Sequence, residues 1–148
     1  MWIAIKKDTF LSAEDLNNIY TDFLEIASKM TELEYEPPEI ENCAASYDTL
    51  PDEILGYINA VERNIQSIHK VIAGTIIGWT DKHYKKFLWK PVTKNKKAEV
   101  FRWIDWLNDV YKALSNTTLT WEPLTDINGE TVTDSNGEII YTAERRLK

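Results

Sequence analysis

Three stretches of the chain place apolar residues at the three- and four-residue spacing of an amphipathic helix. The first stretch follows Ser12, a favourable N-cap residue, and carries Glu14 and Asp15 in its opening turn, where the helix dipole favours acids. Its apolar positions are Leu16, Ile19, Tyr20, Phe23, Leu24, Ala27 and Met30. This spacing predicts a helix that begins after Ser12 and ends before Pro37-Pro38.

The second stretch carries the most regular apolar pattern in the chain. Pro51 suits the first turn of a helix, and Gly74 is a plausible stop. The apolar positions form a heptad seam of Ile54, Ile58, Val61, Ile65, Ile68 and Ile72. At most three heptads are marginal for an isolated coiled coil, so the seam favours packing inside a helical bundle. The partner helix belongs either to the same chain or to another copy, and Ile58, Ile65 and Ile72 are therefore candidate interface residues.

The third stretch, from about Ala98 to Ser115, has two apolar stripes. One stripe is Phe101, Ile104, Leu107, Tyr111 and Leu114, and the other is Trp103, Trp106, Val110 and Ala113. One stripe is enough to sit on a core, so two stripes predict a helix that is covered on two sides. Because Trp is enriched at interface anchors, Trp103, Trp106 and Val110 form the candidate protein contact surface. The alternative is that another part of the same chain covers them.

The last thirty residues change to a β-rich pattern. Leu119–Trp121, Thr131–Thr133 and Ile139–Thr142 are separated by Asn128-Gly129 and Asn136-Gly137. Asn-Gly is a strong hairpin signal because both residues tolerate positive φ. The pattern predicts a three-stranded antiparallel meander. The expected fold is therefore α+β, with a helical domain over residues 1–116 and a meander appendage over residues 117–148.

Charge is distributed along the chain in blocks, although the net charge of the 148 residues is only −7. Residues 8–62 carry 14 acids and a single base, Lys29. Residues 63–102 carry ten bases and two acids. Complementary blocks of this kind guide encounter and register more than they add affinity. Either the blocks fold on one another, or they meet on neighbouring copies, or both are simply solvated.

The basic block contains a lysine-rich segment interleaved with Tyr84, Phe87 and Trp89. Its lysines are Lys82, Lys85, Lys86, Lys90, Lys94, Lys96 and Lys97. This composition fits a nucleic-acid surface. The isoelectric point near 4.9 and the acidic first half oppose that hypothesis, because they repel phosphates. A lysine-rich loop packed on the acidic segment explains the same residues.

The chemical motifs of enzymes are not found in the sequence. It has no Gly-rich phosphate loop, no Gly-x-Ser-x-Gly elbow and no metal ligands at the usual spacings, so we expect no catalytic, cofactor or metal site. The glutamates around Pro37-Pro38 are typical of a solvated loop, and Cys43 is typical of a structural thiol. The first residues do not have the pattern of a signal peptide, and the longest nearly apolar run, Val71–Trp79, is too short to span a membrane.

The chain resembles short proteins encoded among the tail and baseplate genes of phages that infect Gram-positive bacteria. The resemblance rests on Trp2 near the start, on two helical motifs and on a late helix rich in Trp and Asn. The matching residues are Leu16-Asn17-Asn18-Ile19, Tyr57 to Ile65, and Trp103, Trp106, Leu107, Asn108 and Tyr111. It covers roughly residues 1–114 and implies a non-enzymatic virion component, present in several symmetric copies and assembled in the host cytoplasm.

The sequence thus predicts a structural assembly or adaptor protein of a phage tail or baseplate. Its expected partners are other tail proteins and copies of itself, with no cofactor and no membrane. The alternative is a small nucleic-acid-binding or regulatory protein that uses the lysine-rich segment 82–97.

Overall fold

The computed structural model describes residues 13–46, 51–84 and 97–148. They form three helices followed by two strands: α1 (Ala13–Glu32), α2 (Pro51–Ile72), α3 (Lys97–Ser115), β1 (Thr117–Pro123) and β2 (Tyr141–Leu147). The α+β fold and the three predicted helices are confirmed. The helix bounds also follow the sequence signals, since α1 begins directly after Ser12 and Gly74 takes a positive φ of 72° just beyond α2.

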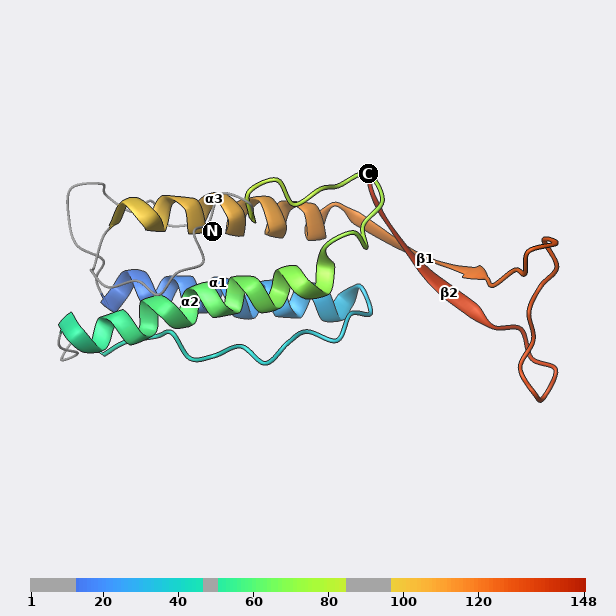
Figure 1. Cartoon of the computed structure of the whole chain (residues 1–148), viewed down its shortest axis with the longest axis horizontal. Helices are drawn as coiled ribbons and strands as arrows, with labels where there is room; N and C mark the ends of the chain where they lie inside the picture. Colours follow the sequence, from blue (N-terminus) through green and yellow to red (C-terminus); the bar gives the residue numbers. More distant parts are fainter. Residues whose placement is uncertain (1–12, 47–50, 85–96) are drawn as a thin grey trace.

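All three helices run in the same direction, so their C-terminal ends meet at one end of the bundle (Figure 1). Because each helix starts at the same end of the bundle, the chain needs a long connecting segment, here called a return, to run back before the next helix begins. The described part of the first return, residues 33–46, runs back along the bundle in an extended conformation. Asn64 on α2 holds it by accepting a hydrogen bond from the Glu41 amide (2.8 Å) and donating one to the Glu41 carbonyl (3.0 Å).

The core lies between the three helices and under the extended return. The seam of α2 faces inward, with Ile65, Ile68 and Ile72 fully buried. Leu16, Ile19, Phe23, Ile26 and Met30 of α1 are buried as well. The return adds Leu33, Tyr35, Cys43 and Ala45 to this core, while its glutamates remain exposed, as predicted for a solvated loop.

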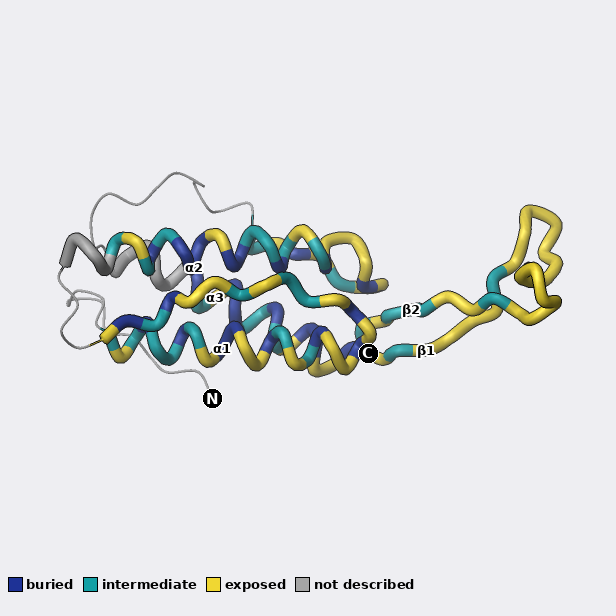
Figure 2. The backbone as a smooth tube through the Cα atoms, turned by 90° about the horizontal axis from the view of Figure 1, so that it is seen from below, coloured by how far each residue is buried: buried dark blue, intermediate teal, exposed yellow. Residues whose placement is uncertain are grey.

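The C-terminal region corrects one prediction. The sheet has two strands, not three, and pairs β1 with β2 antiparallel from Thr117–Leu147 to Pro123–Tyr141. The expected middle strand, Thr131–Thr133, makes only the isolated bridges Thr125–Thr131 and Thr133–Ile139. It cannot extend further because a turn follows directly on either side, centred on Gly129 and Gly137, which take the expected positive φ of 81° and 80°. The paired strands and this tip form an arm that projects beyond the end of the bundle (Figure 2).

Candidate interaction surface

The base of the arm, residues 117–119 and 145–148, is fixed to the end of the bundle where the helices terminate. The segment after α2 pairs with β2, since the Ile77 amide donates to the Arg145 carbonyl (2.8 Å) and the Leu147 amide donates to the Ile77 carbonyl (2.9 Å). The Lys148 amide donates to the Asn116 carbonyl (3.0 Å). These bonds make the base continuous with the bundle.

Arg145 is the main side-chain anchor of the arm. Its guanidinium donates to the carbonyls of Leu33 (2.8 Å) and Glu34 (3.0 Å), just beyond the C-terminus of α1, and lies 3.8 Å from the centre of the Tyr35 ring. A cation suits this place because the carbonyl dipoles at a helix C-terminus are negative. The Tyr35 hydroxyl in turn bonds the Thr75 hydroxyl, which ties the first return to the segment after α2.

The two faces of the arm differ in polarity. Directly opposite residues of an antiparallel pair lie on the same face, so the β1–β2 register sorts the side chains. One face, here called the aromatic face, carries Thr117, Leu119, Trp121, Pro123, Tyr141, Ala143, Arg145 and Leu147. The other face carries Thr118, Thr120, Glu122, Thr142, Glu144 and Arg146.

The aromatic face is covered only near the base. Leu119 and Leu147 pack against the bundle core. Two residues further along the strands, Trp121 is 54% exposed and Tyr141 is 52% exposed. The aromatic face is therefore buried at the base of the arm and exposed to solvent further along the strands. Its only charged residue is Arg145, which the bundle holds.

The tip of the arm is built on an eight-residue repeat. Leu124, Val132 and Ile140 close a ring of backbone hydrogen bonds: the Leu124 amide donates to Ile140, Val132 to Leu124, and Ile140 to Val132 (2.7–3.1 Å). Each turn between them is held by an aspartate. Asp126 accepts from the amides of residues 128 and 130, and Asp134 accepts from those of residues 136 and 138, all at 2.8–3.0 Å. These carboxylates stabilise turns, which explains the repeated Asp-x-Asn-Gly-Glu motif without a metal ion.

The predicted contact surface on α3 must be corrected. Trp103, Trp106 and Val110 are all fully buried inside the chain. The Trp106 indole N–H donates to Asp81 (2.9 Å) and that of Trp103 to Glu62 (3.4 Å). Because carboxylates of the same chain receive both N–H groups, these rings belong to the core, which is the alternative that the sequence left open. Ile58, Ile65 and Ile72 are likewise core residues of the bundle.

The lysine-rich segment falls mostly outside the described residues. Lys85, Lys86, Lys90, Lys94 and Lys96 are not described. Lys82 is described and exposed, and Lys97 is the first residue of α3. The possible basic surface therefore remains a prediction from the sequence.

Asp81 is the centre of a buried polar cluster. Its carboxylate lies 2.7 Å from Nδ1 of His69, accepts the Trp106 N–H and accepts the Tyr84 amide (3.2 Å). The Tyr84 ring stacks on the His69 ring at 3.5 Å, and burial together with the nearby Asp81 charge raises the pKa of the Tyr84 hydroxyl. The cluster joins α2, α3 and the segment between them, so we interpret it as a structural support of the bundle.

Cys43 is fully buried beside Asn64. Burial raises the pKa of its thiol to about 12. A thiol that stays protonated at neutral pH is a poor nucleophile. This agrees with the structural role that the sequence predicts.

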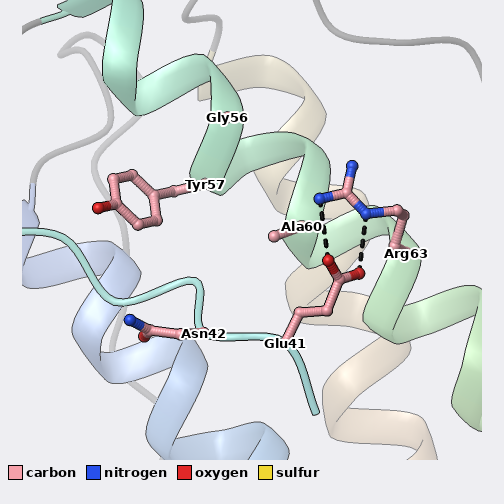
Figure 3. A pocket seen from close by; sticks show the side chains of 6 residues that line it. All are labelled: Glu41, Asn42, Gly56, Tyr57, Ala60 and Arg63. Carbon is pink, nitrogen blue, oxygen red and sulfur yellow. Dashed lines mark hydrogen bonds and ion pairs between the residues drawn. The ribbon is translucent and has the colours of Figure 1, made fainter. Parts of the chain in front are cut away.

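An open groove of about 700 Å³ lies between the first return and α2 (Figure 3). It is lined by Glu41, Asn42, Gly56, Tyr57, Ala60 and Arg63. Arg63 donates two hydrogen bonds to Glu41 (2.8 and 3.1 Å), and this pairing raises the pKa of the Arg63 guanidinium. The two charged groups of the groove thus neutralise each other.

The described residues form neither a metal centre nor a membrane span. Across residues 13–46, 51–84 and 97–148, no three His, Cys, Asp or Glu side chains gather closely enough to hold a metal ion. Within the same residues, no helix has the length and apolar character needed to cross a membrane.

Comparisons with known proteins do not assign the chain to a family. No family model matches it, and neither the curated proteins nor the solved structures contain a match.

Proposed function

We propose that this protein is a structural assembly or adaptor protein that works through protein–protein contacts made by its C-terminal arm. The observation that carries the proposal is the aromatic face, which leaves the core at Leu119 and continues into solvent at Trp121 and Tyr141. Large aromatic side chains dominate the energetics of protein interfaces. A rigid bundle that holds such a face away from its own body suits an adaptor.

The anchoring of the arm supports the same proposal. A two-stranded hairpin alone is at best marginally stable in water. Here Arg145, Ile77 and Asn116 fix the base of the hairpin to the bundle. The arm is therefore presented in a defined direction, which a partner can recognise at a low entropic cost.

The proposed setting is the tail or baseplate of a phage. The tail or baseplate setting rests on a resemblance to short tail-region proteins. The motifs that carry it are Leu16–Ile19, Tyr57–Ile65 and Trp103–Tyr111. An adaptor that holds its neighbours by an arm fits such an assembly.

A complementation experiment tests the proposal. In the phage that encodes the chain, the gene is deleted and replaced with the wild type, with the double variant Trp121→Ser/Tyr141→Ser, or with Leu24→Ser. Leu24 lies on α1 and is 45% exposed, so it is a matched exposed apolar residue outside the arm. Negative-stain microscopy should show complete tails with the wild type and Leu24→Ser, and incomplete tails with the double variant. Normal tails from the deletion would overturn the proposal.

A further inference from the structure

The outer edge of β2, on the side away from β1, is paired only at the base of the arm. There the Ile77 amide donates to the Arg145 carbonyl and the Leu147 amide donates to the Ile77 carbonyl, so Arg145 and Leu147 direct these groups outward. Along an antiparallel strand, every second residue bonds the paired strand, and the residues between them direct their N–H and C=O groups outward. Tyr141 and Ala143 therefore direct theirs to the same outer edge. Among the described residues, only the segment at Ile77 bonds this edge.

The part of this edge beyond Ile77, residues 141–144, is here called the open edge. Tyr141 is 52% exposed and Thr142 is exposed. Figure 2 shows the strands running clear of the bundle beyond their base. A row of unpaired backbone donors and acceptors is a template for a further extended strand.

The outer edges of the two strands differ in how they are protected. Proteins commonly block a free edge with Pro or Lys, or cover it with another segment. On β1, Pro123 stands at an outward position and has no N–H to offer, and Leu119 packs against the bundle core. The open edge of β2 contains neither Pro nor Lys. It is therefore the better template of the two.

The side chains beside the open edge define the strand that fits it. Tyr141 and Ala143 lie on the aromatic face, with Trp121 opposite Ala143. Thr142 and Glu144 lie on the opposite face, here called the polar face. From residue 117 to residue 144 the arm carries six acids and no base, so an acidic strand would be repelled. The complementary strand has apolar residues on the aromatic face and basic residues on the polar face.

We propose that the open edge binds an extended segment of another protein as a third strand of the arm, with apolar and basic residues alternating along that segment. Main-chain hydrogen bonds supply affinity in this mode of recognition, and alternate side chains supply specificity. The segment at Ile77 already makes bonds of this kind, so the added strand continues an existing pairing along the same edge. This inference rests on the proposed function and deepens it, because it states how the arm holds its partner.

Titration of the full chain with a blocked peptide, Lys-Val-Lys-Val-Lys-Val-Lys, tests the pairing. Amide NMR should show saturable binding with a Kd below about 1 mM, and the Tyr141 and Ala143 amides should exchange more slowly in the complex. The Trp121 amide, on the outer edge of β1, should keep its exchange rate. The matched peptide Glu-Val-Glu-Val-Glu-Val-Glu should not bind. Equal binding of both peptides, no saturable binding of the first, or protection of Trp121 in place of Ala143 would overturn the proposal.

A proline substitution tests the backbone bonds. Ala143→Pro removes an outward N–H without removing a bond to β1, and it should weaken peptide binding by at least about tenfold. Ile127→Pro is the matched control, since Ile127 is fully exposed and lies at the second position of the Asp126–Gly129 turn, where Pro is favourable. It should not change the affinity. Unchanged binding by Ala143→Pro, or an equal loss in Ile127→Pro, would contradict the proposal.

Modified peptides give the same test without changing the protein. The Lys-Val peptide is N-methylated either on its valines or on its lysines, which blocks one of its two edges in each case. Only one edge of the peptide can pair with β2, so one modified peptide should lose binding and the other should keep it. Equal affinities of the two would contradict a strand pairing.

A charge substitution tests the polar face. Glu144→Gln should weaken binding of the Lys-Val peptide by about threefold, because a basic residue of the added strand loses its neighbouring carboxylate. Glu130→Gln removes the same charge at the tip and should have little effect. Equal effects of the two variants would show that only net charge matters and would contradict basic residues on this face.

The complementation experiment separates this inference from the proposed function. Ala143→Pro should give incomplete tails, and Ile127→Pro should give complete ones. Complete tails with Ala143→Pro, beside incomplete tails with Trp121→Ser/Tyr141→Ser, would overturn the strand pairing and leave the proposed function standing. Sedimentation velocity should show the purified chain at 17.2 kDa. A dimer that Ala143→Pro abolished would overturn the inference, because a second copy would then occupy the edge.

Discussion

The bundle and the arm both carry periodic apolar side chains, but only the bundle covers them. In the bundle, helical stripes from α1, α2 and α3 converge, and Trp103 and Trp106 are completely buried. In the arm, the period of two produces an equally clear apolar face, yet Trp121 and Tyr141 are half exposed. An apolar pattern therefore predicts that a surface will be buried, but not by which molecule.

The largest expected contrast is between tryptophans of the two regions. Trp106→Ala should lower the free energy of unfolding by about 3–5 kcal/mol, because it opens a cavity and leaves Asp81 without one of its donors. Trp121→Ala should change the free energy of unfolding of the monomer by less than about 1 kcal/mol. Urea denaturation at low protein concentration measures both. Similar losses would show that the arm is part of the cooperative core.

Asp22 lies on α1, and its protonation should make the free energy of unfolding of the bundle depend on pH. Burial, together with the negative charge of Glu25, raises the pKa of the Asp22 carboxyl from 3.8 to about 7 in the folded chain. The folded state therefore holds this proton between about pH 4 and 7 while the unfolded state releases it, so stability falls as the pH rises through that window. Asp22→Asn should remove this loss, which is on the order of 4 kcal/mol at pH 8 because each pKa unit is worth about 1.4 kcal/mol. Urea titrations at pH 4 and pH 8 measure the difference, and an equal effect of the substitution at both pH values would contradict the raised pKa.

Arg145 is expected to decide whether the arm keeps its direction. Arg145→Gln should cost about 1–3 kcal/mol, because the carbonyls of Leu33 and Glu34 lose a charged donor. Hydrogen exchange should show faster opening of β1 and β2, with the amides of α2 little changed. Arg146→Gln is the matched control, since Arg146 bonds only Glu144 among the described contacts. Equal effects of the two variants would show that the anchor is not specific.

The smallest effect is expected at the tip. Gly129 has a φ of 81°, and the space around the position of a Cβ atom is open, so Gly129→Ala adds backbone strain without a clash. The expected cost is about 1 kcal/mol, seen as faster exchange of the Glu130 amide. The melting temperature of the bundle should not change. A lower melting temperature would mean that the tip contributes to the core.

The local features of the fold could be predicted from the sequence. The start of α1 after Ser12, the start of α2 at Pro51 and the positive φ of Gly129 and Gly137 all depend on residues next to one another in the chain. The exposed glutamates of the first return follow in the same way from their alternation with prolines and apolar residues. Capping and turn chemistry act over a few residues, and so they can be recognised without a structure.

The candidate site depends on pairings that the sequence does not specify. The second stripe of α3 resembles an interface, but Asp81 and Glu62 lie opposite its tryptophans and accept their N–H groups, which places the stripe inside. The alternation of Leu119, Trp121 and Pro123 was present in the sequence as a signal for the aromatic face. Only the register with Tyr141 and Ala143 shows that residues of both strands combine into one apolar face.

The sequence by itself determined where the helices and turns lie, because these depend on interactions between near neighbours. The tertiary structure decided which stripe of α3 is core, that two strands pair instead of three, and that the arm leaves the bundle with its aromatic face uncovered. Those outcomes depend on which distant segments pack together. A periodic pattern predicts only that a face is apolar and tends to be buried, not which segment buries it.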